Sequence, residues 1–396
     1  MTKKLTKQNL INFLLLCVIT GNLLSVIIPN LTKYTSFDYW KRYDQLKYTY
    51  ENSQYVQKNP KVGWIPDEFV FSYAAGAYVK GVNPILIDSE LAPLGKYLIG
   101  LSIILTGNEN IIIIICAVLS LYLMYLIGKQ VFLNSTLALI PSMFLSFETI
   151  FKNQLIYVPL FDIIQLPFLL ASLYFFNKGM NRASKHRLLN FILANISLGG
   201  FISVKFFVTG FIIIATWLVV IILRKDKQAL KFLLISLPFS LFVLIASYFK
   251  IFIDGYTLRQ FFGIQKWIFL YHQSKLIMPF TIWPLIYFNK WYVWYGDKPI
   301  ISDGQWTVMW PIIQTISLLT IILYVLNKIK KRREIEVVMI WSLLYILFVS
   351  FGNASSRYLV IYIPILYIVS LYGFTELTKI LLKKLKTKVN YGTIKT

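Results

Sequence analysis

Apolar residues in this chain are gathered into a series of runs, each nearly long enough to cross a lipid bilayer. The hydrocarbon core is about 30 Å thick, and a helix of about twenty apolar residues spans it. Charged residues make up only 14% of the chain, against roughly 25% in a soluble domain. We therefore expect an all-α integral membrane protein. The expected spans are 10–28, 110–128, 133–150, 160–177, 188–204, 206–223, 231–250, 307–326, 335–352 and 358–378.

Basic residues lie in short clusters between these runs, and they determine the expected orientation because positively charged loops stay cytoplasmic. All clusters fall on that side only if 94–106, a shorter apolar stretch, lies at the membrane surface instead of crossing. The sequence then predicts about ten transmembrane helices with both termini cytoplasmic. If 94–106 crossed, two clusters would face outward, and we reject that topology. The clusters are Lys178, Arg182, Lys185 and Arg187; Arg224, Lys225, Lys227 and Lys231; Lys328, Lys330, Lys331, Arg332 and Arg333; and Lys383, Lys384, Lys386 and Lys388.

This topology makes the chain a single polytopic membrane domain, 1–396, with two large outer loops. The first loop covers about 29–109 and the second about 251–306. The tyrosine-rich stretch 33–61 in the first loop is expected to form an amphipathic helix at the level of the lipid headgroups. The predicted localisation is the cell membrane, with multiple passes.

The composition excludes several classes of function. The net charge of +23 suggests nucleic acid, but the cations lie beside apolar runs, which is typical of loops next to anionic lipid. We therefore expect membrane lipids and no nucleic acid as partners. Cys17 and Cys116 both fall within apolar runs, so neither a disulfide framework nor a cysteine metal site is expected. His186 and His272 are too few for most histidine metal centres.

A few of the 17 acidic residues stand where they favour chemistry. Asp67 and Glu68 follow Pro66 on the predicted outer side, and Asp162 lies at the outer end of a span. An ionisable side chain in an apolar run is costly and marks a candidate functional site. Structural alternatives remain open, because Asp67 and Glu68 can cap the following helix. Asp162 can extend to the membrane interface or pair with a nearby lysine such as Lys152.

Isolated cations are expected at the same membrane depth as these acids. An arginine at a helix start is disfavoured by the helix dipole, so Arg357 needs an anionic partner, and a phosphate is one candidate. Lys96 and Lys205 can hold the phosphate of a lipid-linked substrate, while a nearby carboxylate deprotonates an incoming hydroxyl or amine. Alternatively, Lys205 lies in a tight outer turn with its stem in lipid and its ammonium in water.

The first outer loop contains four short motifs: Pro66-Asp67-Glu68, Tyr73-Ala74-Ala75-Gly76-Ala77-Tyr78, Gly81-Val82-Asn83-Pro84 and Ala92-Pro93-Leu94-Gly95-Lys96-Tyr97-Leu98-Ile99-Gly100. Leu160-Phe161-Asp162, Gly199-Gly200 followed by Lys205, and Trp283-Pro284-Leu285 come later. In these segments the chain resembles the protein O-mannosyltransferase family and its bacterial aminoarabinose-transferase relatives. The resemblance implies a GT-C-type bundle with interfacial helices in the first outer loop.

The resemblance also implies a glycosyltransferase activity. A sugar would move from a polyprenyl-phosphate donor to a protein, lipid or glycan acceptor on the extracytoplasmic face, with inversion. Asp67 would be the catalytic base, and Glu68 would be a neighbour that helps to order the loop. Asp162 would be a second acid near the sugar or the acceptor.

The other candidate site residues are expected to bind substrate. Lys96, Lys205 and Arg357 would contact the donor phosphate. His272 lies in the late outer loop, where a structural hydrogen bond is the alternative to an acid–base role. Tyr157 stands near the position at which the family has an arginine.

The chain also departs from the family. Leu91-Ala92 stands where the mannosyltransferases usually have His-Pro, and no long soluble insertion interrupts the late outer loop. These differences leave the sugar and the acceptor open. A divalent cation, Mg²⁺ or Mn²⁺, near Asp67 is compatible with this chemistry, but no set of ligands in the sequence requires one.

A transporter or lipid flippase is the alternative function, although the sequence shows no two related halves. A membrane scaffold is a third possible function.

Overall fold

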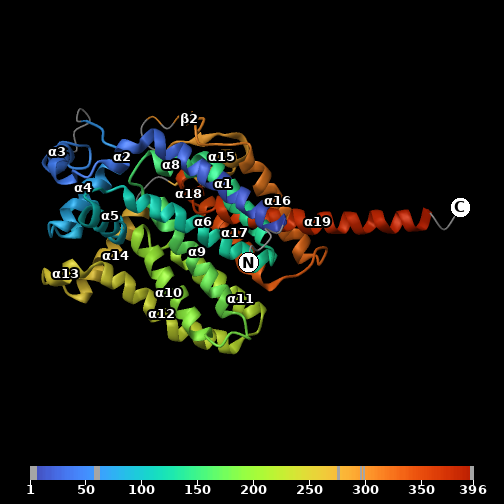
Figure 1. Cartoon of the computed structure of the whole chain (residues 1–396). Coiled ribbons are helices and arrows are strands. Elements are labelled where there is room, and N and C mark those ends of the chain that lie inside the picture. The colour runs from blue at the N-terminus through green and yellow to red at the C-terminus, as the bar shows by residue number, and fades with distance from the viewer. Residues whose placement is uncertain (1–6, 58–62, 274–276, 295–296, 298, 393–396) are drawn as a thin grey trace, which may run out of the picture.

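The structure is a computed structural model that describes residues 7–57, 63–273, 277–294, 297 and 299–392, with side chains described as far as residue 383. Helices account for nearly all of its regular structure (Figure 1). Parts of two predicted loop segments, 58–61 and 274–276, lie outside the described residues, as do the side chains of the tail lysines beyond Lys383.

Each predicted apolar run contains one long helix. Those helices are α1 (Lys7–Ile27), α6 (Ile111–Phe132), α7 (Ser135–Phe147), α9 (Phe161–Gly179), α10 (Arg187–Val204), α11 (Thr209–Leu223), α12 (Lys227–Ser247), α16 (Met309–Val325), α17 (Arg333–Ser350) and α19 (Ile363–Gly392).

Five helical segments of the described chain are long and apolar enough to cross a membrane: Lys7–Thr35, Ile111–Phe132, Arg187–Val204, Lys227–Ser247 and Ile363–Lys383. Shorter apolar helices of 10–17 residues, α7, α11 and α16 among them, accompany these five. The prediction of a polytopic all-α membrane protein is confirmed, whereas the number of about ten crossings stays a prediction.

The predicted first outer loop is largely helical. It contains α2 (Leu31–Thr35), α3 (Tyr39–Glu51), α4 (Asp67–Val79) and α5 (Leu94–Thr106), with short 3-10 turns at Ile28–Asn30 and Pro84–Leu86. One face of α3 is buried through Tyr39, Tyr43, Leu46 and Tyr50, which recur at the spacing of an amphipathic helix. The α5 helix has 13 residues, about 20 Å at 1.5 Å per residue, so by itself it is shorter than a bilayer core.

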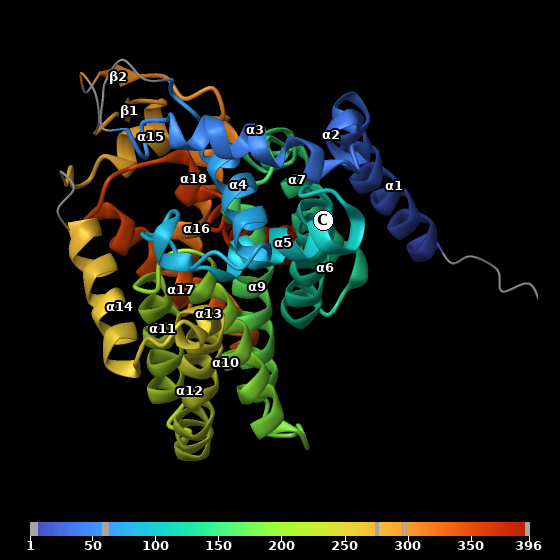
Figure 2. The ribbon, with the colours of Figure 1, turned by 90° about the vertical axis from the view of Figure 1, so that its left-hand side faces the viewer.

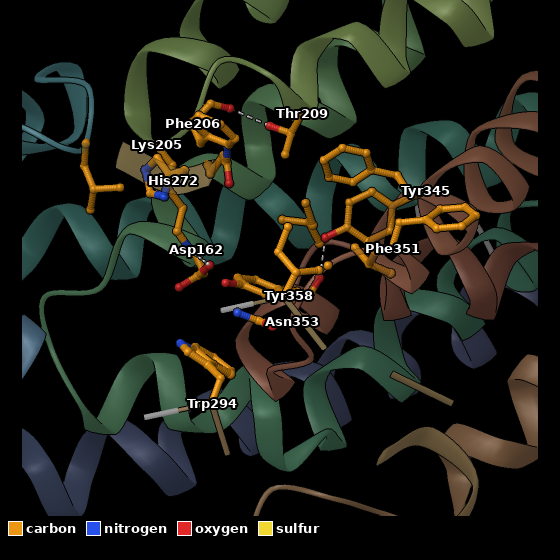
Figure 3. A pocket seen from close by; sticks show the side chains of 17 residues that line it. Asp162, Lys205, Phe206, Thr209, His272, Trp294, Tyr345, Phe351, Asn353 and Tyr358 are labelled. Carbon is orange, nitrogen blue, oxygen red and sulfur yellow. Dashed lines mark hydrogen bonds and ion pairs between the residues drawn. The ribbon is translucent and has the colours of Figure 1, made fainter. Parts of the chain in front are cut away.

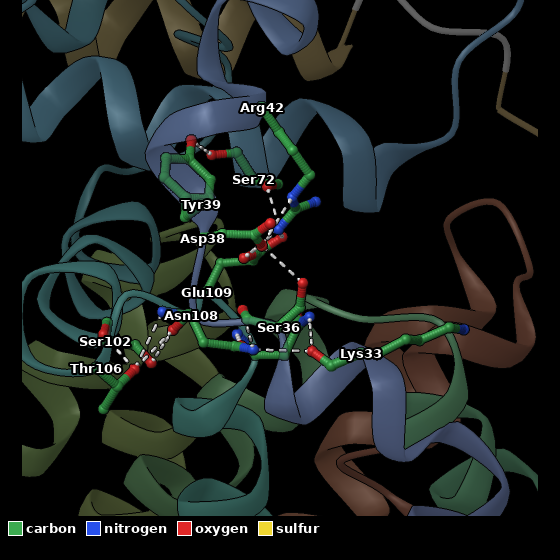
Figure 4. Close-up of polar contacts among 11 residues, drawn as sticks. Lys33, Ser36, Asp38, Tyr39, Arg42, Ser72, Ser102, Thr106, Asn108 and Glu109 are labelled. Carbon is green, nitrogen blue, oxygen red and sulfur yellow. Dashed lines mark hydrogen bonds and ion pairs between the residues drawn. The ribbon is translucent and has the colours of Figure 1, made fainter.

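A buried polar cluster fastens this loop to the bundle (Figure 4). Arg42 on α3 donates to both carboxylate oxygens of Glu109, at 3.1 and 3.2 Å, and Glu109 also accepts from the hydroxyl of Ser72 on α4. Asn108 donates to the backbone oxygens of Lys33 and Ser36. The turn between α5 and α6 therefore holds α3 and α4 in place, and α4 carries the acidic pair Asp67-Glu68.

The second predicted outer loop is also structured. It contains α13 (Phe249–Ile253), α14 (Leu258–Gln273) and α15 (Ile282–Phe288), followed by the two-residue strands β1 (Trp291–Tyr292) and β2 (Ile300–Ile301). The strands pair antiparallel, with Trp291 opposite Ile301. Two further short helices, α8 (Thr149–Ile156) and α18 (Ser356–Leu359), complete the described elements.

Helix α9 is the most enclosed of the long helices. It packs against α6 and α10, and most of its side chains are buried, including the polar Asp162 and Gln165. Helix α1 is the opposite case, because only Ile19 and Val26 of its side chains are buried. An apolar helix surface of this kind is expected where lipid, and not water, surrounds the protein.

The connections between the long helices divide into two groups at opposite ends. The helices α3, α4, α5 and α13 lie together at the left of Figure 1, and α19 extends beyond the bundle on the right. In Figure 2 the helices α4 and α5 lie between α14 and α1. The basic connections 180–187, 224–226 and 326–333 come together at the other end of α9, α11 and α17, through contacts described below.

Candidate active site

Asp162 is the centre of the candidate site. It lies in the first turn of α9, where its negative charge complements the helix dipole. Its side chain is buried, and two cations hold it: Lys205 Nζ lies 2.5 Å from Oδ1, and Arg357 Nε lies 3.1 Å from Oδ2. The alternative that Lys152 pairs with this acid is wrong, because Asp162 takes both partners from elsewhere in the chain.

Arg357 links Asp162 to Asp67. It lies in the short helix α18, directly after a turn that precedes the last long helix, and its Nη1 donates to Oδ2 of Asp67. The two acids come from α9 and α4, so a single guanidinium joins carboxylates 195 and 290 residues away along the chain. Arg357 was predicted to need an anionic partner, and the structure gives it two, the carboxylates of Asp67 and Asp162.

Asp67 is the first residue of α4. Its second oxygen accepts a hydrogen bond from the Tyr55 hydroxyl at 2.8 Å. Burial by itself would raise the pKa of Asp67, but the Arg357 charge and the hydrogen bonds from Arg357 and Tyr55 outweigh it, and the pKa lies below its ordinary value. In this arrangement Asp67 is ionised, and both of its oxygens are engaged.

Lys205 directly follows the last residue of α10. Its ammonium lies over the ring of Tyr358, 5.6 Å from the centroid, in addition to the ion pair with Asp162. Its backbone oxygen accepts from the amide of Ala92, which ties this turn to the start of the last first-loop motif. The structure therefore brings four of the predicted residues together, namely Asp67, Asp162, Lys205 and Arg357.

A cavity of about 380 Å³ opens beside these charges (Figure 3). Asp162 and Lys205 line it directly, whereas Arg357 and Asp67 are not among its lining residues and are joined to Asp162 by ion pairs. Much of the wall is apolar or aromatic, which is the usual composition of a pocket for an organic ligand. The other lining residues are Leu91, Gln165, Phe206, Thr209, His272, Ile277, Trp294, Tyr345, Phe348, Val349, Phe351, Gly352, Asn353, Tyr358 and Ile361.

His272 lies on the wall of this cavity. Its Nε2 is 3.1 Å from the backbone oxygen of Glu90, and its ring lies 4.4 Å from the Phe206 ring, measured between centroids. A carbonyl oxygen only accepts hydrogen bonds, so Nε2 carries a proton here. This contact fixes the orientation of the imidazole at the edge of the pocket.

Three predicted residues are not part of the ion-pair network. Lys96 is enclosed: it lies 2.8 Å from Oδ2 of Asp88 and donates to the backbone oxygens of Asp88 and Leu91. Glu68 is half-buried next to Asp67, and Tyr157 is largely exposed at the end of α8. Within the described chain, the cavity is lined without any of these three.

Sequence reasoning did not single out several residues of the site. Tyr55 was placed only among interfacial aromatics, and Asp88 was not considered as a partner of Lys96. Asn353 lies in the run Gly352-Asn353-Ala354-Ser355, whose turn-forming composition could have indicated a loop that presents Arg357. For the contact between Tyr55 and Asp67 no comparable local signal exists.

The arrangement does not favour a divalent cation at Asp67. Arg357 already contacts both Asp67 and Asp162, and its positive charge would repel a cation. The only oxygen ligands that Asp67 and its neighbour Tyr55 could offer are one carboxylate and one phenol. In the described part of the chain, no group of three or more His, Cys, Asp or Glu side chains is placed to hold a metal ion.

Fold and site together define a class of protein: a polytopic helical membrane protein with acids and cations gathered at a cavity near one end of the bundle. Two solved structures share this fold, ArnT from Cupriavidus metallidurans in the apo state and the same protein bound to undecaprenyl phosphate. Their TM-scores are 0.56 and 0.55, with 13% and 14% identity. The alignments cover 78% and 81% of this chain and 55% and 58% of those structures. The fold is thus that of the GT-C membrane glycosyltransferases.

The family comparison agrees with the fold. Residues 110–282 match the family described as dolichyl-phosphate-mannose-protein mannosyltransferase. This region includes Asp162, Lys205 and His272, while Asp67 and Arg357 lie outside it. A comparison with curated proteins finds no significant match.

Proposed function

We propose that the chain is a membrane glycosyltransferase that moves a sugar from a polyprenyl-phosphate donor to an acceptor, with inversion. The observation that carries the proposal is the convergence of Asp67, Asp162, Lys205 and Arg357 in one ion-pair network, although they come from four separate parts of the chain. Asp162 and Lys205 connect this network to the cavity. The fold shared with ArnT, one structure of which is bound to undecaprenyl phosphate, supports a lipid-phosphate donor.

Lys205 and Arg357 are the groups that would bind the donor phosphate. Both are partly accessible, and a guanidinium can grip two phosphate oxygens at once. Asp162 would keep the two cations in position, since it contacts both. When a phosphate replaces Asp67 as a partner of Arg357, Asp67 loses its strongest attractive charge, and its pKa rises toward a value more useful for a base.

The chemical step then uses Asp67 as the base. Asp67 takes the proton of the acceptor hydroxyl or amine, and the acceptor atom forms a bond to the anomeric carbon of the sugar. The bond from that carbon to the phosphate oxygen breaks, and its electron pair stays on the polyprenyl phosphate. Lys205 and Arg357 stabilise the negative charge that develops there. Attack from the side opposite the leaving group inverts the anomeric carbon.

The proposal places this site on the extracytoplasmic face. Asp162 lies in the first turn of α9, whereas the basic connection 180–187 directly follows the last residue of this helix. The 19 residues of α9 extend about 28 Å, close to the thickness of a bilayer core. Basic loops favour the cytoplasmic side, so we place the cavity on the extracytoplasmic side.

The alternative function, a transporter, predicts ionisable groups near the middle of helices, whereas Asp162, Lys205 and Arg357 lie at helix ends.

A transfer assay tests the proposal. Purified protein is incubated with radiolabelled polyprenyl-phosphate sugars and a membrane extract, and the product that carries label is identified. Asp67→Asn should reduce transfer about a thousandfold, because Asn keeps the shape of Asp but cannot accept the proton. Asp44→Asn, which changes an exposed acid on α3, is the matched control and should leave transfer unchanged. Full activity in Asp67→Asn would remove this residue from the mechanism, and vesicle uptake without transfer would favour a transporter.

A further inference from the structure

A second polar cavity lies at the opposite end of the bundle from the candidate active site. It has a volume of about 300 Å³, and its wall comes from the connection between α9 and α10, the end of α11 with the connection that follows it, and the first turn of α17. The lining residues are Met180, Arg182, Leu223, Arg224, Asp226, Arg333 and Glu336. None of the functions described above uses this cavity.

Asp226 is the first acid at this cavity, and both of its carboxylate oxygens already accept hydrogen bonds from the protein. Asp226 Oδ2 accepts from Arg182 Nε at 3.1 Å and from Arg187 Nη2 at 2.9 Å. Its Oδ1 accepts from the amide of Ala229 as the N-cap of α12. Asp226 thus orients two guanidinium groups through Oδ2, while its Oδ1 caps α12.

The second acid is engaged in the same way. Glu336 Oε2 accepts from Arg224 Nε at 2.9 Å, and its Oε1 accepts from the Tyr324 hydroxyl at 2.8 Å. Arg224 also donates to the backbone oxygen of Arg333. The Arg333 side chain is exposed and makes no ion pair with any described residue.

The cavity therefore has a surplus of positive charge. Three arginines line it, Arg182, Arg224 and Arg333, together with two carboxylates. Arg187 adds a fourth positive charge beside Asp226, so the four arginines exceed the two acids by two charges. Guanidinium groups held in fixed positions are suited to phosphate, because the planar fork matches two phosphate oxygens. An anion is the ligand that this charge pattern favours.

The place of the cavity in the fold indicates the source of that phosphate. It lies at the ends of membrane-spanning helices, and Leu223 on its wall is 65% exposed next to Ile222, which is 68% exposed. Exposed apolar side chains at such a position face acyl chains, so a lipid can present its headgroup to the arginines while its chains lie along α11. A free phosphate would use the arginines alone.

We propose that this cavity binds the phosphate of an anionic lipid headgroup on the face of the membrane opposite the candidate active site. The proposal stands independently of the transferase reaction. It assigns Arg182 and Arg333 as direct ligands, since their side chains are the most accessible of the four, and it assigns Asp226 and Glu336 to hold the other two arginines in place.

Lipid binding to the purified full chain in neutral detergent tests this proposal. Phosphatidylglycerol, phosphatidylcholine and inorganic phosphate are titrated separately, and binding is followed by native mass spectrometry and by the thermal transition. We expect phosphatidylglycerol to bind at least tenfold more tightly than phosphatidylcholine. Arg182→Gln combined with Arg333→Gln should weaken phosphatidylglycerol binding at least tenfold.

The matched control is Lys185→Gln combined with Lys227→Gln, which removes the same charge from exposed residues of the same face outside the cavity. This control should change binding less than twofold. Equal losses in the two double variants would show a diffuse surface effect and overturn the proposal, as would inorganic phosphate binding as tightly as the lipid. If the glutamine variant fails to fold, Arg182→Lys with Arg333→Lys keeps the charge but loses the fork and should still weaken binding.

Discussion

Two ion-pair networks at the same end of the bundle each pair a basic side chain with an aspartate, but in opposite surroundings. Lys96 and Asp88 pair inside the protein, with side chains 0% and 3% exposed. Arg357 and Asp67 pair at the edge of a cavity, with side chains 29% and 40% exposed. In the first network the ammonium is enclosed by a carboxylate and two backbone oxygens of the protein, whereas in the second the partners are accessible enough for a ligand to replace one of them. Access, and not charge, separates a structural pair from a candidate catalytic one.

Electrostatics at Asp88 reinforce this difference. Burial raises the pKa of Asp88 to about 7, even though the Lys96 ammonium acts to lower it. Asp67 shows the reverse balance, because Arg357 and Tyr55 outweigh burial and keep its pKa low. The enclosed pair therefore gains little from ionisation, while Asp67 is kept ionised in readiness for a new partner.

The largest effect is expected from breaking the enclosed pair. Lys96→Met should lower the free energy of unfolding by about 3 kcal/mol, because it leaves a buried carboxyl and two carbonyl oxygens without their donor. Lys41→Met, at an exposed position on α3, is the control and should change stability little. Unfolding in a denaturing detergent titration measures the difference.

The pH dependence of this loss has a definite sign. Without Lys96, the folded-state pKa of Asp88 rises further above its unfolded value, so the folded protein binds more protons and loses stability as pH rises through that pKa. The loss in Lys96→Met should therefore be larger at pH 8 than at pH 5. Sugar transfer per folded molecule should stay unchanged in Lys96→Met. A loss of transfer in this variant would instead support Lys96 as a phosphate ligand, as the family resemblance implies.

The next largest effect concerns the acid shared by two cations. Asp162→Asn should reduce transfer about a hundredfold, because Lys205 and Arg357 lose the carboxylate that positions both of them. Stability should fall less than in Lys96→Met, since the cavity gives both cations access to water. Single-turnover kinetics and thermal unfolding measure the two quantities. If Asp162→Asn were the less stable variant and kept its activity, the comparison between the networks would be reversed.

Removal of the bridging guanidinium should have a moderate effect on rate and a clear one on pH dependence. Arg357→Gln should lower kcat/KM about thirtyfold, which corresponds to the loss of ~2 kcal/mol of charged hydrogen bonding. It also removes the main attractive charge on Asp67, so the pKa of this base rises and the acidic limb of the pH–rate profile moves to higher pH. Arg259→Gln, an exposed change on α14, should leave the limb in place. An unshifted limb in Arg357→Gln would show that Asp67 is not the titrating base.

The smallest effect is expected at Tyr55. Tyr55→Phe removes one hydrogen bond to Asp67 and should lower transfer about fivefold, as expected for ~1 kcal/mol. The acidic limb should move in the same direction as in Arg357→Gln but less far, because the hydroxyl contributes less than the guanidinium to the low pKa. A fivefold loss without any movement of the limb would assign Tyr55 a packing role only.

The long helices could be predicted from sequence because each depends on a local property, the length of an apolar run. Helix α9 illustrates this, since 160–177 was predicted and Phe161–Gly179 is observed. Arg357 could be recognised as a residue in need of an anion, because the dipole argument is also local. Its actual partners could not be predicted, because no local sequence pattern around Arg357 indicates a contact with Asp67, which lies 290 residues earlier.

The same limit explains Lys96. Its motif resembles that of the family, and sequence reasoning assigned it to the donor phosphate together with Lys205. Whether an ammonium faces a cavity or the interior depends on how the segment from Asp88 to Leu91 folds back over it. That fold is a tertiary property without a periodic signal.

The bridge made by Arg357 has a consequence for biosynthesis. Asp67 emerges from the ribosome 290 residues before Arg357, and its helix is fastened only once Glu109 has been made. The guanidinium partner follows only after the helices from α6 to α17 have been made. A chain that stalls or is cut before α18 would thus lack the bridge between Asp67 and Asp162, so we expect no transfer activity from it.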